Sequence, residues 1–511
     1  PSSGFGVSGE GVTFTNKGTI YATSGENGVN FQNDAIWAGN GATAINEGKI
    51  VAKDAYGMRV GKDGLASKIV NNGSIYVESS GVGMELGGAK DSEAVNNGLI
   101  SVGEVAEDKF GHGVLIQDQE GARFTNEGTI TAGKGASAIE IKKHAQEKVT
   151  TAKVVLKGNS KVDGLIHVGE GVKAAVISVE EGVTDTLTLK AENVATGTDQ
   201  IGTKLKVMTG SAITLADKQD SKLAKVVVDE TSRLNLSISE GDNTVKEAKI
   251  KGILNITKLN SRLDGKTDAN LPKDQLLIDR GQSFTYDHAQ MYVDGKVFTG
   301  NLKVGRLTGS NGIVTFKGGD HSFTKLTVGA NGSAFNVEEG AVVTVGGLHL
   351  YHGSGEGAAS TVTVNGSTLI NTGALTFEKA DSTYTVEGKL ELANGTFQTA
   401  ATDFFKKQDA TAADAEAKPV YVVTGNEKFL SGNGTLNLTS DAFEFTLDDL
   451  KAAQGMINPH DQSKTNSVND DIKLVFVNGT LKAGETLTAD KVDNLSLTNH
   501  DGVATDSLRN S

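Results

Sequence analysis

Apolar and polar residues alternate along most of this chain. A period of two residues predicts β-strands, whose side chains point alternately to opposite faces. The alternation is clearest in a segment of the form apolar-x-Asn-x-Gly-x-Ile, which occurs at residues 14–20, 44–50, 69–75, 94–100 and 124–130. We interpret the central Asn-x-Gly as a turn between two short strands, because Asn and Gly tolerate left-handed backbone.

A second short strand is predicted later in each unit, usually after a glycine. The five segments are Val29-Asn30-Phe31, Met58-Arg59-Val60, Met84-Glu85-Leu86, Val114-Leu115-Ile116 and Ile139-Glu140-Ile141. The middle residue is often polar or charged. We therefore expect one face of this strand to be exposed to water.

The motif recurs at a nearly fixed interval. Its glycines stand at positions 18, 48, 73, 98 and 128, which are separated by 30, 25, 25 and 30 residues. A 25-residue unit with an occasional five-residue insertion explains these intervals. Two or three short strands cannot close a core alone, whereas stacked coils bury their inward faces and pair every strand with its neighbours. The sequence therefore predicts an all-β fold, a right-handed parallel β-helix.

Stacked coils place equivalent residues in columns at a spacing of about 4.8 Å. We expect an inward aliphatic stack of the motif isoleucines Ile20, Ile50, Ile75, Ile100 and Ile130. An internal amide ladder, each side chain bonded to the next, is expected of Asn16, Asn46, Asn71, Asn96 and Asn126. A leucine-rich repeat has a similar length but needs several Leu at fixed offsets, and here Asn, Gly and Ile recur instead.

The chain divides into three regions by the regularity of the pattern. Residues 1–145 carry the regular repeat of about 25 residues, and residues 146–304 keep strand alternation in irregular coils, with a loop or excursion expected at 274–288. In residues 305–511 short strands resume. Helical or loop insertions are expected there near 404–418 and 445–456, because the strand pattern breaks at both places.

Composition and charge narrow the class of protein. Gly is 64 and Pro 4 of 511 residues, as expected for stacked strands, because Pro lacks the N–H that an interior strand donates. There is no Cys, so disulfides do not hold the fold. A net charge of −14 argues against nucleic acid as a partner, although 49 Lys and Arg are compatible with local basic patches.

Membrane and export segments are not evident in the sequence. No apolar run approaches the roughly 20 residues of a membrane-spanning helix, so we predict no transmembrane segment in this chain. The first residues show no signal peptide and no initiator Met. We expect the chain to be a processed piece of a longer protein.

The five Asn-x-Gly-x-Ile segments resemble the passenger repeats of type V autotransporters, especially self-associating and AIDA-like adhesins. The resemblance covers about the first quarter of the chain, and beyond it only strand alternation with Gly and Asn turns. It implies a right-handed β-helix at the bacterial cell surface or outside the cell. The translocator barrel of such proteins is expected in a part beyond this chain, because no alternating lipid-facing strands end the sequence.

Motifs for catalysis and metal binding are missing. There is no Gly-Asp-Ser nucleophile loop, no G-x-S-x-G elbow and no calcium loop of the D-x-[DN]-x-[DN]-G form. His349 and His352 point to opposite faces if they lie on a strand, so a surface or turn placement is expected rather than a metal site. The adjacent pairs Asp448-Asp449 and Asp470-Asp471 are interpreted as solvated charges. We therefore predict no catalytic, cofactor-binding or metal-binding residue and no cofactor.

The functional prediction is a surface adhesin. A rod covered with outward polar residues such as Thr19, Lys49, Ser74 and Thr129 offers many weak contacts in an array. Tyr21 and Tyr76 should also point outward. The expected partners are a host surface glycan, an extracellular-matrix protein, or other copies of the passenger. Two alternatives stay open: a passive stalk, and a polysaccharide lyase or hydrolase with two or three carboxylates beside a basic residue in one groove.

Overall fold

The computed structural model of the chain forms two compact units, both built from β-strands. The N-terminal unit comprises Pro1–Asp268 and Met291–Lys296, and the C-terminal unit Ala269–Gln290 and Val297–Ser511. The structure describes residues 4–24, 33–61, 64–78, 80–107, 109–143, 150–193, 202–238, 243–257, 274–306, 310–353, 360–377, 388–400, 405–408, 420–423, 430–439, 444–445, 473–476, 480–481 and 495–497. The division between the units falls within the region 146–304.

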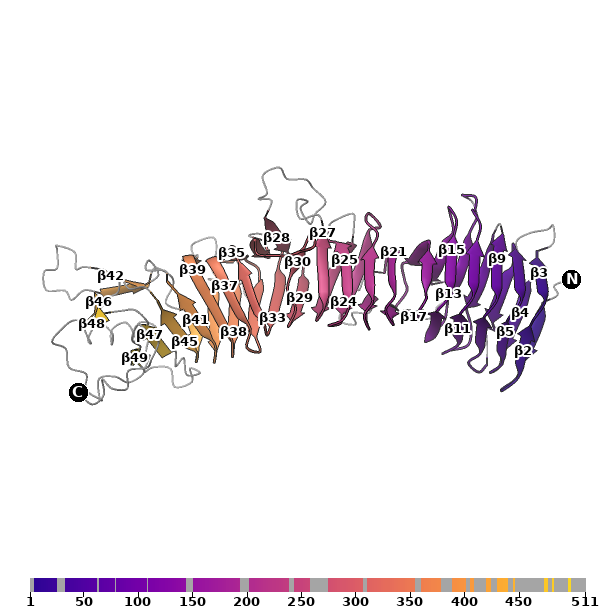
Figure 1. Cartoon of the computed structure of the whole chain (residues 1–511), viewed down its shortest axis with the longest axis horizontal. Helices are drawn as coiled ribbons and strands as arrows, with labels where there is room; N and C mark the ends of the chain where they lie inside the picture. The colour runs from indigo at the N-terminus through magenta and orange to yellow at the C-terminus, as the bar shows by residue number, and fades with distance from the viewer. Residues whose placement is uncertain are drawn as a thin grey trace. The chain divides into compact units, whose positions relative to one another are not determined.

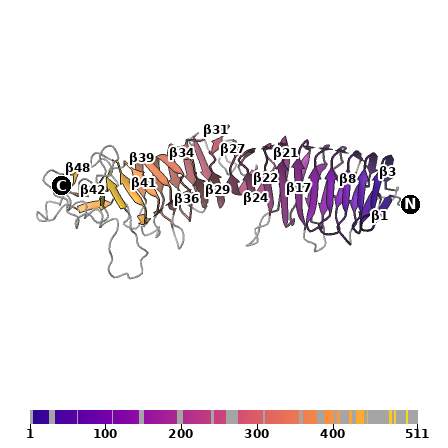
Figure 2. The same cartoon turned by 60° about the horizontal axis from the view of Figure 1, so that its bottom comes forward.

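In the N-terminal unit the strands stack coil upon coil into three parallel sheets (Figures 1 and 2). The first sheet runs through β1 (Phe5–Ser8), β4 (Asp34–Gly39), β7 (Tyr56–Val60), β10 (Gly81–Leu86), β13 (Gly111–Gln117), β16 (Ser137–Lys142), β19 (Leu165–Val168), β21 (Thr184–Ala191), β23 (Ala212–Leu215), β25 (Arg233–Ser237), β27 (Ile253–Thr257) and β30 (Tyr292–Val293). The second sheet runs through β2 (Thr13–Asn16), β5 (Thr43–Asn46), β8 (Lys68–Asn71), β11 (Glu93–Asn96), β14 (Ala122–Asn126), β17 (Thr151–Lys157), β20 (Ala174–Glu180), β22 (Thr203–Val207), β24 (Ser221–Val228) and β26 (Asn243–Ile250). The third sheet contains β3 (Thr19–Thr23), β6 (Lys49–Lys53), β9 (Ser74–Glu78), β12 (Leu99–Val102), β15 (Thr129–Ala132) and β18 (Lys161–Asp163). The predicted parallel β-helix is thereby confirmed.

The register of the strands produces the predicted inward columns. Ile20 lies opposite Ile50, Ile50 opposite Ile75, and the column continues to Ile100 and Ile130. Ile20 is 9% exposed, and the other four side chains are completely buried. The hydrophobic stabilisation of the coil therefore comes from an aliphatic column that runs through the stack.

The amide ladder is confirmed as well. The Nδ2 of Asn16 donates to the Oδ1 of Asn46 at 2.8 Å, and the same bond links Asn46 to Asn71, Asn71 to Asn96 and Asn96 to Asn126, at 2.7–2.8 Å. In the next coil Leu156 occupies the position of the asparagine. The Nδ2 of Asn126 donates instead to the Oγ of Ser160 at 2.7 Å. Every buried Nδ2 of the ladder thus has an acceptor in the following coil.

The glycines of the motif are required by close packing and not by a left-handed turn. None of these glycines and none of the ladder asparagines has a positive φ. A Cβ on Gly48, Gly73, Gly98 or Gly128 would lie 2.0–2.1 Å from the carbonyl oxygen of the equivalent glycine one coil earlier. We explained the Asn-x-Gly segment by the tolerance of Asn and Gly for left-handed backbone, and this explanation is wrong. Glycine is required because the backbone of the neighbouring coil occupies the space that a side chain would need.

One strand assignment differs from the sequence prediction, and the composition of the coil changes after β18. In the first coil the strand in register with Met58-Arg59-Val60 is β4, through Ile36-Trp37-Ala38, while Val29-Asn30-Phe31 lies outside the described residues. Beyond β18 the third sheet ends among the described strands, and the coils continue with two strands, one in each of the other sheets. This change explains why the repeat blurs after residue 145.

The C-terminal unit has the same parallel stacking in two sheets. One contains β29 (Gln282–Asp287), β33 (Gly312–Lys317), β36 (Ala334–Glu338), β38 (Thr361–Asn365), β40 (Lys389–Ala393) and β44 (Leu430–Gly432). The other contains β28 (Gln275–Ile278), β32 (Asn301–Val304), β35 (Lys325–Val328), β37 (Val342–Leu350), β39 (Thr368–Phe377), β41 (Thr396–Thr399), β45 (Thr435–Leu438), β47 (Lys473–Phe476) and β49 (Leu495–Leu497), with β34 (Asp320–Phe323) paired to β37. Their buried positions are rich in aromatic rings, including Phe284, Phe316 and Phe335.

Residues 274–288, expected to form a loop, contain the strands β28 and β29 instead. Phe284 and Tyr286 of β29 are completely buried, so this segment is part of the stack. The motif also returns once in this unit, as Asn371-Thr372-Gly373. Here the Nδ2 of Asn371 donates to the carbonyl oxygen of Gly373 at 2.8 Å and to the Oγ1 of Thr399 at 3.2 Å.

The two segments where we expected helices or loops are described only at their edges. Phe405–Gln408 forms a strand, β42, which pairs in antiparallel fashion with β43 (Val420–Val423) and is therefore not helical. Glu444–Phe445 forms β46, which pairs with β48 (Thr480–Leu481). Residues 409–418 and 446–456 lie outside the described residues. Within the described part of the chain no helix has the length and hydrophobicity needed to cross a membrane.

Candidate functional site

The outward side chains of the first sheet form a buried or half-buried layer, although we expected a face exposed to water. Glu85 and Leu115 are each 2% exposed and Glu140 is 7% exposed. We call this set the outer layer. It consists of Asp34, Trp37, Tyr56, Arg59, Val82, Glu85, His112, Leu115, Ser137, Glu140 and His167.

The backbone of each strand explains why these side chains point outward. A Cβ on Gly57 would lie 3.0 Å from Cγ2 of Ile75 in the core. A Cβ on Gly83 would lie about as close to Ile100, and one on Gly113 to Ile130. The following residue, Met58 in β7, is completely buried. Two consecutive inward positions leave the residues on either side, Tyr56 and Arg59, on the outer face.

The outer layer is organised in register across seven strands. One column runs from Trp37 through Arg59, Glu85, Leu115, Glu140 and His167 to Lys190. A parallel column runs through Asp34, Tyr56, Val82, His112 and Ser137. Charged, aromatic and aliphatic side chains of successive coils therefore lie next to one another.

The first part of the layer is centred on Arg59. Its Nη1 lies 3.4 Å from Oδ1 of Asp34, and its Nε lies 3.7 Å from Oε2 of Glu85. The guanidinium carbon stands 5.2 Å from the centroid of the Tyr56 ring. Gln117 donates from Nε2 to the other oxygen of Glu85 at 2.6 Å. Four successive coils are thus connected by side chains outside the core.

An apolar patch separates the two charged parts of the layer. Tyr56, Val82 and Leu115 form a cluster whose members are at most 8% exposed. His112, in register with Val82, is 6% exposed, and neither of its ring nitrogens has a hydrogen-bond partner in the structure. Burial lowers the pKa of His112 to about 4, more than the carboxylate of Glu140 raises it. His112 is therefore neutral near pH 7 and behaves as part of the apolar patch.

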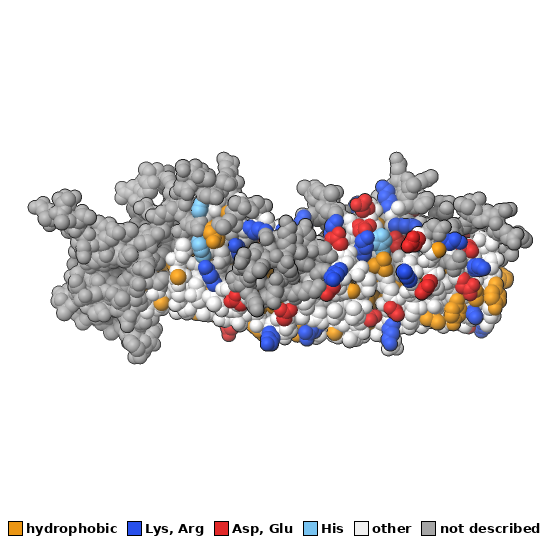
Figure 3. All heavy atoms as spheres, turned by 90° about the horizontal axis from the view of Figure 1, so that it is seen from above, with side chains coloured by type: hydrophobic (Ala, Val, Ile, Leu, Met, Phe, Trp, Pro, Cys, Tyr) orange, Lys and Arg blue, Asp and Glu red, His pale blue; other side chains and the backbone are white. Residues whose placement is uncertain are grey.

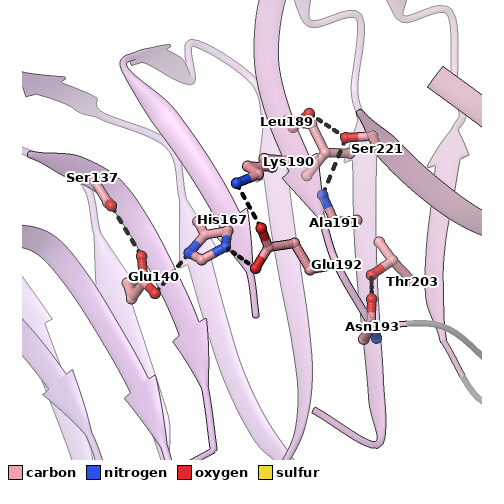
Figure 4. Close-up of polar contacts among 10 residues, drawn as sticks. All are labelled: Ser137, Glu140, His167, Leu189, Lys190, Ala191, Glu192, Asn193, Thr203 and Ser221. Carbon is pink, nitrogen blue, oxygen red and sulfur yellow. Dashed lines mark hydrogen bonds and ion pairs between the residues drawn. The ribbon is translucent and has the colours of Figure 1, made fainter. Parts of the chain in front are cut away.

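The second charged part is a row of three side chains from consecutive coils (Figure 4). Nδ1 of His167 lies 2.8 Å from Oε1 of Glu140, and Nε2 lies 3.1 Å from Oε2 of Glu192. Ser137 donates its hydroxyl to Oε2 of Glu140 at 3.0 Å, and Nζ of Lys190 stands 2.6 Å from Oε1 of Glu192. Both ring nitrogens face carboxylates, so the doubly protonated imidazolium satisfies both hydrogen bonds.

The pKa values follow from this arrangement. The hydrogen bond to Glu140 raises the pKa of His167 above 6.5, outweighing the effect of burial. Burial alone would raise the pKa of Glu140, but the hydrogen bonds from His167 and Ser137 and the positive charge of His167 together outweigh it, and the net shift is downward. Lys190 lowers the pKa of Glu192. Between about pH 4.5 and 6.5 the row is therefore an ionised carboxylate–imidazolium–carboxylate clamp.

The chemistry that this layer supports is structural. The hydroxyl of Ser137 is bonded to a carboxylate and not to an imidazole, so it lacks the base that activates a serine nucleophile. The two carboxylates hold opposite nitrogens of His167 and do not converge on one point. Among the described residues no group of three or more His, Asp or Glu side chains is placed to hold a metal ion.

The residues singled out from the sequence lie elsewhere. His349, half-buried on β37, has its ring centroid 4.2 Å from that of Tyr351, and His352 follows the strand. Tyr21 points outward and is 70% exposed. Tyr76 is half-buried beneath Nζ of Lys49, 4.9 Å from its ring centroid. The pairs Asp448-Asp449 and Asp470-Asp471 lie outside the described residues.

Comparison of this chain with protein-family models, curated proteins and solved structures finds no match. The outer layer is visible in the sequence only as a residue that recurs after Ala-Ile, Gly-Met or Gly-Val, namely Trp37, Arg59, Glu85, Leu115 and Glu140. We interpreted its polar and charged examples as solvated positions.

Proposed function

We propose that this chain is a bacterial cell-surface adhesin of the autotransporter-passenger type. It attaches cells to a host glycan or matrix protein, or to other copies of itself. The observation that carries the proposal is the in-register stacking of coils, which repeats outward polar positions in columns. One such column of the third sheet consists of Thr19, Lys49, Ser74, Leu99, Thr129 and Lys161, of which only Leu99 is apolar.

A column of this kind suits multivalent attachment. Neighbouring members stand about 4.8 Å apart, so a partner with a regular surface meets an outward side chain, in most coils a polar one, at regular intervals. Each hydrogen bond contributes about 1 kcal/mol net, and an array of them gives avidity that one contact lacks. Acidic and basic side chains lie interspersed on the face of the N-terminal unit seen in Figure 3, which favours many small contacts over one deep pocket.

The competing function is a polysaccharide lyase or hydrolase. The outer layer does bring carboxylates next to cations from successive coils, as such an enzyme requires. However, the side chain of Glu85 is 3% exposed and that of Glu140 is 9% exposed. Their oxygens are bonded to Gln117, His167 and Ser137. Burial and pairing favour stabilisation of the coil over contact with a polymer.

A glycan and matrix-protein array with the purified chain tests the proposal. The same soluble polysaccharides are incubated with the chain and examined for new reducing ends or unsaturated products. Retention of one class of glycan or matrix protein without cleavage supports an adhesin. Cleavage products that disappear in the Glu140→Gln variant, while the Glu93→Gln control on the second sheet retains them, would support the enzyme instead.

A further inference from the structure

A dense basic face lies on the second sheet of the N-terminal unit. We call it the lysine face, and it consists of Lys204 and Lys206 of β22, Lys222 and Lys225 of β24, and Lys246 and Lys249 of β26. The three strands are consecutive neighbours in the sheet. Figure 2 labels the first two of them, β22 and β24. All six lysines are at least partly exposed.

The charges on this face are poorly balanced. Glu247 is the one carboxylate on the three strands, so six lysines against one glutamate give a local charge of +5. Glu247 is engaged by Lys225 at 2.8 Å and by Lys249 at 3.8 Å. Within the part of the chain that the structure describes, Lys204, Lys206 and Lys222 have no carboxylate within ion-pair distance. The whole chain carries −14, so this face opposes the overall charge.

The register makes the arrangement costly for the fold. Lys204 lies directly opposite Lys225 on the neighbouring strand. Like charges in directly paired positions of a sheet destabilise it, because their side chains lie about 5 Å apart. Lys206 and Lys249 stand in one column, separated by Val227. A ligand that carries negative charges at regular intervals would reduce the repulsion between these lysines.

We propose that the lysine face binds an acidic polysaccharide, with sulfate or carboxylate groups spaced along an extended sugar chain. The inference rests on the proposed function and specifies a partner for it. A sheet face with cations on each of three adjacent strands matches a linear polymer of anionic rings. The three strands present neither Arg nor aromatic residues, which single-stranded nucleic acid uses for stacking. Lysine gives hydrated point charges, so the binding should be weak per group and sensitive to salt.

The test measures binding of the whole purified chain to dextran sulfate, with neutral dextran as the uncharged counterpart. The parent chain should bind dextran sulfate and not dextran. The triple variant Lys204→Gln, Lys206→Gln, Lys249→Gln should bind about tenfold more weakly or worse, with a shallower dependence on salt. The matched control, Lys53→Gln, Lys134→Gln, Lys173→Gln, makes the same change in charge at exposed lysines outside this face and should lose less than about twofold. Replacing Lys204, Lys206 and Lys249 by Arg, which keeps the positive charge, should preserve binding of dextran sulfate.

Three outcomes would overturn the inference. They are equal loss in the control and test variants, equal binding of dextran and dextran sulfate, and tighter binding of single-stranded DNA or of anionic lipid vesicles than of dextran sulfate. Thermal unfolding of both triple variants checks that they fold, and none of the substituted side chains lies in the core. If displayed chains make cells adhere while the purified chain ignores dextran sulfate, this inference fails and the adhesin stands. If the purified chain binds dextran sulfate but displayed chains do not make cells adhere, the lysine face stands as a polysaccharide site and the adhesin proposal fails.

Discussion

The carbonyl oxygen of Gly48 lies 2.0 Å from the place where a Cβ on Gly73 would stand. The two glycines occupy the same position in consecutive coils, so the contact is set by the strand spacing and not by the local turn. We expect Gly73→Ala to destabilise the N-terminal unit by about 1–3 kcal/mol, as overpacking against rigid backbone does. Urea unfolding followed by circular dichroism measures the change.

Gly18 offers a matched control for this prediction. It has the same place in the motif, but the nearest atom to a Cβ there is Oδ1 of Asn16 at 3.9 Å. Gly18→Ala should therefore change the stability by less than about 0.5 kcal/mol. Equal costs at Gly18 and Gly73 would contradict the packing explanation and restore the turn explanation.

The amide ladder predicts a difference between two adjacent asparagines. Asn71 is completely buried and bonded to Asn46 and Asn96, whereas Asn72 is exposed and accepts one bond from Asn97. Asn71→Leu should cost roughly 1–3 kcal/mol, because two buried amides lose a partner. Asn72→Leu should change the stability little. If Asn71→Leu is as stable as the parent in chemical denaturation, the ladder does not stabilise the coil.

The clamp at His167 predicts a pH dependence with a definite sign. The raised pKa of His167 means that its contribution is fully present below about pH 6.5 and is lost as the pH rises through the folded-state value. The lowered pKa values of Glu140 and Glu192 mean that their contributions are present above about pH 4.5 and are lost as the pH falls further. The clamp should therefore stabilise most strongly between these values.

His167→Gln tests the clamp because glutamine is neutral at every pH. We expect the variant to be less stable than the parent by about 1.5–3 kcal/mol near pH 5.5, the range for hydrogen bonds to charged groups. The difference should shrink near pH 8.5. A difference that grows as the pH rises would contradict the raised pKa of His167, because a histidine that is neutral in the fold loses stability when its unfolded form takes up a proton below about pH 6.5.

The sequence predicts the interior of the regular coils well. The nearly fixed interval between motifs shows that the coils are equivalent. The alternation of apolar and polar residues places Ile75 and Asn71 on the inward face, and a buried amide needs a hydrogen-bond partner in the next coil. These are properties of single strands, and stacking identical units copies them from coil to coil. Both columns therefore appear in the structure as expected.

The sequence does not predict the outer layer. Glu85 and Glu140 stand at alternate positions of a strand, which for an isolated sheet means contact with water. Their burial depends on Arg59 and His167, each from a neighbouring coil, and on the inward direction of two consecutive residues such as Gly57 and Met58. The side-chain pairs of the outer layer differ from one coil to the next. They therefore leave no repeating pattern in the sequence.

Self-association should depend on salt and on display. The net charge of −14 repels like chains, and raising the ionic strength from about 0.01 to 0.15 M shortens the screening length from about 30 to 8 Å. We expect the purified chain to sediment as a monomer at micromolar concentration. Cells that display many copies should clump more at the higher salt. Clumping that falls as salt is added would point to attraction between opposite charges instead.

Attachment by a displayed chain is the most direct test of the central claim. The full chain is presented on a non-adherent bacterium, and cell–cell clumping and attachment to host cells and matrix-coated surfaces are counted. Cells displaying a charge-matched soluble protein serve as the control. The adhesin account predicts a clear gain in at least one of the three. No gain in any of them, with the displayed chain shown to be folded and accessible, would contradict it and leave an enzyme or a passive stalk as the better explanation.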